Sequence, residues 1–416
     1  MNPFREKAVA LEKLFMDWED LSPKPYDKRE VDPYTRTRII LMNGTEYEQV
    51  WFTHQMARHV EDGDLKRQLA LIRRGEQQQQ KLIAALKPAD ETLLEHTLGY
   101  EQLAVDLTAA LAKREKDGNV KRALDFALLE DFDHVYRYAD LMDLETGEKA
   151  ETVLGGFTEI MPGRPTISEH RFPYDDVKKP IVNKKADPQT RLNVAIITAA
   201  EQQTMNYYMN VCAAYPTEPG RRLYREIGMI EEQHVTQYES LMDPKASYLE
   251  CLLNHEYVEC YLYYSCRETE TDERIRRIWE RLLYQEISHL HSAAELLEHI
   301  EGKDWRQVLG DGEFPDPLAL GSNIDYVRDV LGGTVQLTAL RESWASVDDL
   351  GEDADFHKYQ KSVNHDIGRV QSHAVIKEHI DKAGEDYRFE TVPEPVYALR
   401  DHTVDNTDVG RTPGSV

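Results

Sequence analysis

The chain has 416 residues, of which 41% are hydrophobic and 30% are charged, an ordinary composition for a soluble protein of two or three domains. Its 76 acidic residues against 50 basic residues give a net charge of −26, which argues against nucleic acid and anionic membranes as partners. No run of apolar residues is long enough to span a bilayer, so no membrane is expected as a partner.

The N-terminal residues 1–30 are predicted to form a helix and its lead-in, because an amphipathic pattern begins without any apolar signal segment. The four cysteines form no Cys-x-x-Cys pair, and this excludes a rubredoxin-type iron site. Disulfide frameworks belong mainly to small secreted chains, so we expect reduced thiols and a cytoplasmic protein.

Residues 31–147 are predicted to form a first set of four helices. Apolar residues recur there at helical spacing, and breakers interrupt the pattern near Glu61–Gly63, at Lys87–Asp90 and at Asp117–Gly118. Asp90 followed by an acidic residue is typical of a helix N-cap. The helices should therefore form hairpins with short turns.

The remaining segments follow from similar patterns. Residues 148–185 are rich in glycine, proline and charge, and we interpret them as a linker on the surface. Residues 186–302 repeat the four-helix pattern. Residues 303–390 are predicted to form a helical hairpin with helices over roughly 323–348 and 355–383, and residues 391–416 a tail.

Ligand-type residues recur at one fixed spacing in both sets of helices. The second set contains Glu201, Glu231, His234, Glu256, Glu286 and His289. The residues 155 positions earlier are Glu46, Glu76, Gln79, Glu101, Asp131 and His134. Asp32-Pro33 and Asp187-Pro188 precede the two sets at the same offset, which indicates an internal duplication.

This ligand series predicts a di-metal centre in the second set of helices. A Glu and a His three residues apart lie on one helix face, and four carboxylates with two such pairs form the ligand set of di-metal four-helix bundles. Four carboxylates balance two divalent ions, and the mixture of carboxylate and imidazole suits iron or manganese, with zinc still open.

The first set offers a weaker site. Gln79 is a poor ligand compared with histidine, and Asp131 is one methylene shorter than glutamate. It still supplies Glu46, Glu76, Glu101 and His134. Two loosely held ions, one ion or none are all compatible with this set.

The series resembles the rubrerythrin branch of the ferritin-like di-iron proteins. The resemblance includes Glu259, which follows Glu256 by three residues and whose counterpart in the first set is Ala104. It implies an all-α fold of two tandem ferritin-like four-helix bundles with the C-terminal helical hairpin. One departure is that Lys87–Asp90 and Asp243–Ser247 are short, whereas the family has a long crossover between its second and third helices.

The resemblance also implies a function and roles for individual residues. We expect a di-iron or iron/manganese oxidoreductase that uses O2 or peroxide and an external electron donor. Glu201 with His234 or Glu259 would hold one ion, Glu256 with His289 the other, and Glu231 and Glu286 would bridge them. The resemblance gives Glu259, paired with His234, a catalytic part in peroxide reduction.

Other readings remain open at this stage. One is a ferroxidase or iron-sequestering protein without an organic substrate, and another is a structural protein whose metal sites have decayed. Oxygenation of an organic substrate and assembly into a homodimer are also compatible with the sequence.

Overall fold

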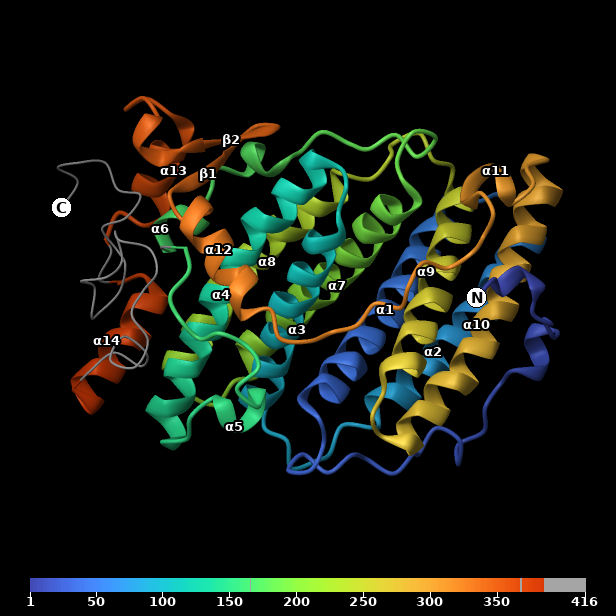
Figure 1. The fold of residues 1–416 in the computed structure, drawn as a ribbon, viewed down its shortest axis with the longest axis horizontal. Coiled ribbons are helices and arrows are strands. Elements are labelled where there is room, and N and C mark those ends of the chain that lie inside the picture. Colours follow the sequence, from blue (N-terminus) through green and yellow to red (C-terminus); the bar gives the residue numbers. More distant parts are fainter. Residues whose placement is uncertain (165, 367–368, 385–416) are drawn as a thin grey trace. The chain divides into compact units, whose positions relative to one another are not determined.

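The computed structural model describes residues 1–164, 166–366 and 369–384, and these residues are mostly helical (Figure 1). The predicted tail, residues 391–416, lies outside the described residues. None of the described helices is both long and apolar enough to cross a bilayer.

Eight long helices occupy the two predicted sets. They are α1 (Pro33–Arg58), α2 (Gly63–Ala84), α3 (Leu93–Arg114), α4 (Gly118–Thr146), α7 (Pro188–Ala214), α8 (Glu218–Glu239), α9 (Tyr248–Thr269) and α10 (Glu273–Glu301). The bounds of α8, α9 and α10 lie 155 residues after those of α2, α3 and α4. The predicted breakers are thus confirmed as helix boundaries.

Side-chain caps explain why the boundaries repeat. Thr92 and Glu95 form a capping box at the start of α3, and Ser247 and Glu250 form the same box at the start of α9. The predicted N-cap at Asp90 was therefore wrong, because the hydroxyl of Thr92 caps the helix two residues later.

The helices separate into two compact units that do not follow the predicted domain boundaries at 31–147 and 186–302. Unit 1 comprises Met1–Glu91, Ile181–Gln203 and Met242–Leu320. Unit 2 comprises Thr92–Pro180, Thr204–Leu241 and the described residues from Gly321 onward. Each predicted set of four helices is divided between both units.

In unit 1, helices from the two ends of the duplicated region pack together. α1 packs on α2 and α9, and α10 packs on α9 and α2. Figure 1 shows α1 and α2, in blue, alongside α9 and α10, in yellow and orange. One hairpin from each set of helices therefore builds this unit.

The predicted N-terminal helix is wrong. Residues 1–32 contain only two short 3-10 turns, Pro3–Arg5 and Leu11–Lys13. Side chains of unit 1 bind this backbone instead: Gln78 accepts from the N–H of Met16 (2.9 Å) and donates to its carbonyl (2.7 Å). These hydrogen bonds satisfy both backbone groups of Met16 without a helix at this residue.

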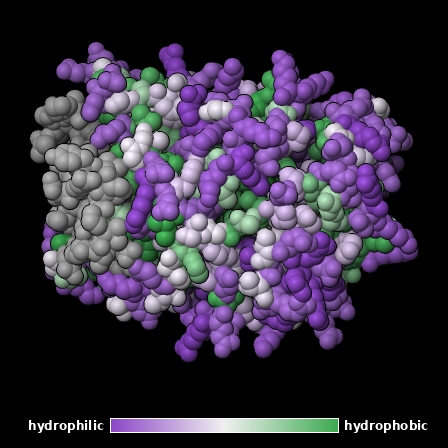
Figure 2. Space-filling model, in the orientation of Figure 1, coloured by the Kyte–Doolittle hydropathy of each residue, from purple (hydrophilic) through white to green (hydrophobic). Residues whose placement is uncertain are grey.

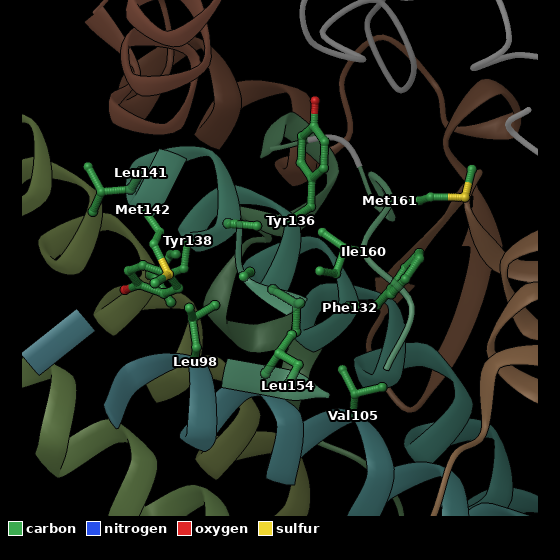
Figure 3. Packing of buried hydrophobic residues seen from close by; sticks show 14 of the residues in the cluster. Leu98, Val105, Phe132, Tyr136, Tyr138, Leu141, Met142, Leu154, Ile160 and Met161 are labelled. Carbon is green, nitrogen blue, oxygen red and sulfur yellow. The ribbon is translucent and has the colours of Figure 1, made fainter. Parts of the chain in front are cut away.

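In unit 2, α4 is the central helix. It packs against α3, α8, α12 (Ile324–Thr334) and α14 (Gln371–Ala383), and α5 (Glu151–Leu154) packs on α3. Figure 3 shows Phe132, Tyr136 and Tyr138 of α4 in this core, with Leu98 and Val105 of α3. Burial of these side chains is the main stabilising contribution to the unit.

The connector between the two sets of helices is not a surface linker. Met161, Arg164 and Arg171 are buried, each at 1% exposure or less. Arg164 donates to the carbonyl oxygen of Phe126 on α4 (3.0 Å), and its guanidinium lies 4.0 Å from the Phe126 ring centre. Part of the connector forms α6 (Thr166–Glu169) within unit 2.

The C-terminal helical hairpin is also corrected. α12 ends at Thr334, and an antiparallel hairpin of β1 (Leu337–Leu340) and β2 (Ser343–Ser346) follows. Gly332 and Gly333 lie in the last turn of α12, where their low helix propensity weakens the helix. α11 (Arg306–Leu309) and α13 (Asp355–Val363) complete the described helices.

Figure 2 shows a face on which hydrophilic residues dominate and apolar residues are scattered in small groups. This agrees with the net charge of −26. The ligand-type residues of both sets, in contrast, are buried.

Candidate metal centres

The first cluster lies inside unit 1, where four helices contribute ligand-type side chains at one level. These are Glu46 of α1, Glu76 of α2, Glu256 and Glu259 of α9, and Glu286 and His289 of α10, each at 1% exposure or less. These residues form two groups, and within each group the donor atoms lie within 4.8 Å of one another. Glu76 belongs to both groups. A carboxylate shared by two groups is in the position to bridge two ions.

His289 points its Nδ1 atom into this cluster. Nδ1 lies 2.8 Å from Glu76, 3.1 Å from Glu286 and 3.9 Å from Glu256. The other side of the ring lies against Gly75, where an added Cβ would stand 2.6 Å from Nε2. The ring of His289 can therefore occupy this position only because Gly75 has no side chain.

Gly75→Ala is expected to displace the His289 ring and weaken metal binding in unit 1, because the ring has no free space on that side. Metal titration of this variant should show lower affinity in unit 1 only. The matched control is Gly63→Ala at the start of the same helix, where a Cβ approaches only the end of the Arg67 side chain, at 3.8 Å. Equal affinity in both variants would contradict this role of Gly75.

Five of the six members of the unit 1 cluster are carboxylates, and His289 is the one basic side chain among these six. Burial, and then the neighbouring carboxylates, hold the pKa values of Glu46, Glu256 and Glu259 well above the usual range. Within the described part of the chain, neither carboxylate oxygen of Glu259 has a hydrogen-bond partner. Bound cations explain both observations, so the donor set fits a metal centre.

Neutral side chains surround the cluster and orient its carboxylates. Gln49 donates from Nε2 to Glu256 at 2.5 Å, and the hydroxyl of Tyr263 donates to Glu46. Gln79 is buried beside them and accepts from Tyr263 at 3.3 Å. Gln79 thus lies at the centre without supplying an imidazole.

The second cluster lies inside unit 2. It contains Glu101 of α3, Asp131 and His134 of α4, and Glu231 and His234 of α8, all fully buried. Glu231 lies between the two imidazoles: one oxygen is 3.1 Å from Nδ1 of His134 and the other is 3.4 Å from Nδ1 of His234. These contacts outweigh burial and lower the pKa of Glu231 to about 2.

The Nε2 atom of His234 points out of the cluster and contacts Glu130 at 2.7 Å. A proton on Nε2 leaves the lone pair of Nδ1 for a metal ion, which is the usual way that a carboxylate orients a histidine ligand. Arg171, from the connector, pairs with Glu130, and this charge outweighs burial and lowers the pKa of Glu130 to about 2. Glu169 of α6 is 3.9 Å from Nε2 of His134.

The counterpart positions in unit 1 have changed together. Gln79 is the counterpart of His234, and Gln285 is the counterpart of Glu130. Unit 1 therefore lacks a counterpart of the His234 imidazole and of the Glu130 carboxylate that orients this imidazole. It contains Glu259 instead, where unit 2 has Ala104.

Glu201 is buried on the part of α7 that belongs to unit 1, three residues before the helix enters unit 2 at Thr204. Its role as a ligand stays a prediction.

The second set of helices does not form one centre as predicted, although all twelve predicted residues are buried and Glu256 groups with His289 as expected. Glu231 and His234 group with side chains of α3 and α4, whereas Glu256, Glu286 and His289 group with Glu76. Glu259 and His234 belong to different units, so the predicted pairing of these two residues is also wrong. Neither unit combines the second histidine with the additional glutamate.

Several residues of the site had no recognisable signal in the sequence. Glu130 directly precedes Asp131, and Arg171 lies in a segment that we interpreted as a surface linker. A buried arginine is identifiable only once its partner is known. Comparisons of the chain with protein-family models, curated proteins and solved structures found no match. The interpretation of the two clusters therefore rests on their own geometry.

Proposed function

We propose that the protein is a di-metal oxidoreductase with one metal centre in each unit, which uses peroxide or O2 as its oxidant. The observation that carries the proposal is the shared glutamate. In each unit, one buried carboxylate, Glu76 or Glu231, belongs to two adjacent groups of donor atoms. Two ions bridged by a carboxylate are the arrangement of di-metal helical bundles.

The architecture in this proposal is two ferritin-like four-helix bundles that arose by internal duplication and are interleaved. The first hairpin of one copy pairs with the second hairpin of the other copy. Support comes from the offset of 155 residues between counterpart helices and from the composition of unit 1.

Unit 2 is the better candidate for redox chemistry. Its donor set of Glu101, Asp131, His134, Glu231 and His234 combines carboxylates with two imidazoles. Such a mixture suits iron or manganese. When bound, these ions would supply electron transfer to the oxidant.

The protein's own residues prepare the centre in three ways. Glu130 holds a proton on Nε2 of His234 and so aims Nδ1 inward. Tyr208 of α7 donates its hydroxyl proton to Glu101, which fixes the orientation of that carboxylate. The packed core of unit 2 excludes water from both contacts.

A second candidate function is metal sequestration, and the composition of the unit 1 cluster favours it. Five carboxylates and one imidazole surround that centre, so two divalent ions leave it with an excess of negative charge. Such a site favours hard, highly charged metal ions. It stabilises their higher oxidation state and so disfavours their reduction. Peroxide-dependent turnover of an added reductant separates the two functions.

Metal content per chain tests the proposal, and the duplication supplies matched variants. The wild type is expected to bind about four ions after expression with iron and manganese, two in each unit. Glu76→Gln should remove the ions of unit 1 and Glu231→Gln those of unit 2, because each change removes the shared carboxylate.

Glu232→Gln, an exposed neighbour of Glu231, is the control and should bind as much metal as the wild type. Peroxide consumption should decrease strongly in Glu231→Gln and little in Glu232→Gln. A wild type that binds no redox-active metal would contradict the proposed function.

A further inference from the structure

Tyrosines gather beside the unit 2 cluster and extend from it toward the surface. Tyr208 is fully buried, and its hydroxyl donates to Glu101 of the cluster. The ring of Tyr207 lies 5.4 Å from that of Tyr208, and the ring of Tyr100 stacks on Tyr207 at 4.2 Å. Tyr207 is half-buried, so two rings connect the cluster with solvent.

A branch of the same group lies deeper in the core. The ring of Tyr138 is parallel to that of Tyr208 at 5.7 Å and lies 4.9 Å from that of Tyr224. Figure 3 shows Tyr138 among Leu98, Leu141 and Met142. Among the described residues, the buried hydroxyl of Tyr138 has no hydrogen-bond partner. Phenylalanine would fill the same space without this cost, so packing does not account for the hydroxyl.

The hydroxyls also form a chain. Oγ1 of Thr97 lies 2.5 Å from the hydroxyl of Tyr224 and 2.8 Å from that of Tyr207. A hydroxyl both donates and accepts, so a proton can pass from Tyr224 through Thr97 to Tyr207. Routes for electrons and for protons therefore run side by side.

Unit 1 provides an internal comparison. The counterparts of Tyr100, Tyr138, Tyr207, Tyr208 and Tyr224 are His255, Ala293, Phe52, Thr53 and Leu69. Counterpart helices of nearly the same length thus pack in unit 1 without any of these tyrosines. Packing of the duplicated helices does not require the phenols, and their presence in unit 2 alone points to a role in its chemistry.

We propose that Tyr207 and Tyr208 form a relay that carries single electrons from a one-electron donor at the surface to the unit 2 cluster. Tyr208 loses an electron to the cluster and its hydroxyl proton to Glu101. Tyr207 then supplies an electron to the Tyr208 phenoxyl radical, which regains its proton from Glu101, while the hydroxyl proton of Tyr207 passes to solvent. The surface donor returns one electron to the Tyr207 radical, and solvent returns the proton. Overall the surface donor is oxidised by one electron and the metal centre is reduced by one. This role rests on the proposed function.

A photochemical experiment tests the relay without a redox-active metal. The full-length protein is prepared with Zn²⁺, and 3,5-difluorotyrosine replaces Tyr208, so that fluorine splitting identifies a radical at this position by electron paramagnetic resonance. A soluble ruthenium(III) tris-bipyridine complex, generated by a light flash, removes one electron from an exposed tyrosine. It cannot touch Tyr208, which is fully buried.

We expect a fluorinated radical at position 208 and a roughly tenfold smaller yield when Tyr207→Phe is added, because phenylalanine is not oxidised by this complex. Tyr174→Phe, which removes an exposed tyrosine elsewhere on unit 2, should leave the yield unchanged. No radical at position 208, or an equal yield in Tyr207→Phe, would overturn the relay. The zinc-loaded protein reports on the relay even if the protein has no activity with peroxide.

Discussion

Glu130→Gln is expected to weaken metal binding in unit 2 by about ten- to a hundredfold while unit 1 keeps its affinity. Glu130 accepts a hydrogen bond from the Nε2–H group of His234, and the ion pair with Arg171 fixes the position of the Glu130 carboxylate. A glutamine can turn its amide nitrogen toward the imidazole and donate to it. The proton would then shift to Nδ1, the nitrogen that faces the cluster, and block the ligand lone pair.

Competition with a chromophoric chelator measures the metal affinity. With Glu76→Gln as the background variant, which removes the ions of unit 1, the measured affinity is that of unit 2 alone. Glu232→Gln on the same background is the control, because this exposed carboxylate lies on the same helix as His234. An unchanged affinity in Glu130→Gln would show that Glu130 does not orient the ligand.

Arg171 separates this effect from a loss of stability. Arg171→Met leaves the carboxylate of Glu130 buried without its strongest partner, and this is expected to cost about 3–5 kcal/mol in the free energy of unfolding. Adding Glu130→Gln to Arg171→Met should recover much of that stability but none of the metal affinity. Denaturant unfolding of the two single variants and the double variant measures the coupling.

The positions of the helices could be predicted from the sequence because local residues determine them. Thr92 and Ser247 cap their own helices, and a glycine in the left-handed conformation follows α4 and α10, at Gly147 and Gly302. Such signals lie within a few residues of the boundary that they set. The pattern of apolar residues then gives the buried face of each helix, and the ligand-type residues lie on it.

The partners of the helices could not be predicted in the same way. In a duplicated chain, α3 has similar surfaces available in both copies, and the apolar pattern does not distinguish them. The deciding feature is the length of the turn at Lys87–Asp90, which is too short for a crossover within one bundle. This short turn departs from the rubrerythrin pattern, and the structure places α2 in unit 1 and α3 in unit 2.

Long-range contacts explain the other differences. The backbone of the N-terminal segment is bound by Gln78, and the connector is held by the pairing of Arg171 with Glu130. The partners in both cases are distant in the sequence, so local propensity indicated a helix and a surface linker. The charged side chain of Arg171 is buried in the connector because its partner, Glu130, lies beside the buried cluster of unit 2.

Removal of metal is expected to destabilise unit 1, and the loss should increase as the pH rises above 4.5, the usual pKa of a glutamate. In the metal-free protein, burial and mutual repulsion raise the pKa values of Glu46, Glu256, Glu259 and Glu286 above 4.5, their usual value. The folded state then binds more protons than the unfolded chain over the range between the two pKa values. Stability is highest below the unfolded pKa and is lost as the pH rises through the folded pKa.

The imidazole of His289 acts in the same direction. Burial alone would lower its pKa, but Glu286 and Glu76 raise it well above the usual value, so its contribution to stability is also lost as the pH rises through the folded pKa. Each pKa unit between the folded and unfolded states corresponds to about 1.4 kcal/mol. Bound metal replaces the protons, and its affinity increases with pH because the ligands must be deprotonated.

The melting temperatures of metal-loaded and metal-free protein should therefore diverge as the pH rises. In the metal-free protein, Glu259→Gln removes one buried carboxylate and should flatten the decline, whereas Glu295→Gln, an exposed change on α10, should leave it as it is. A constant difference in melting temperature across this pH range would mean that the buried carboxylates of unit 1 do not hold the metal. The same result would remove the reason for five carboxylates to lie together in the centre of this unit.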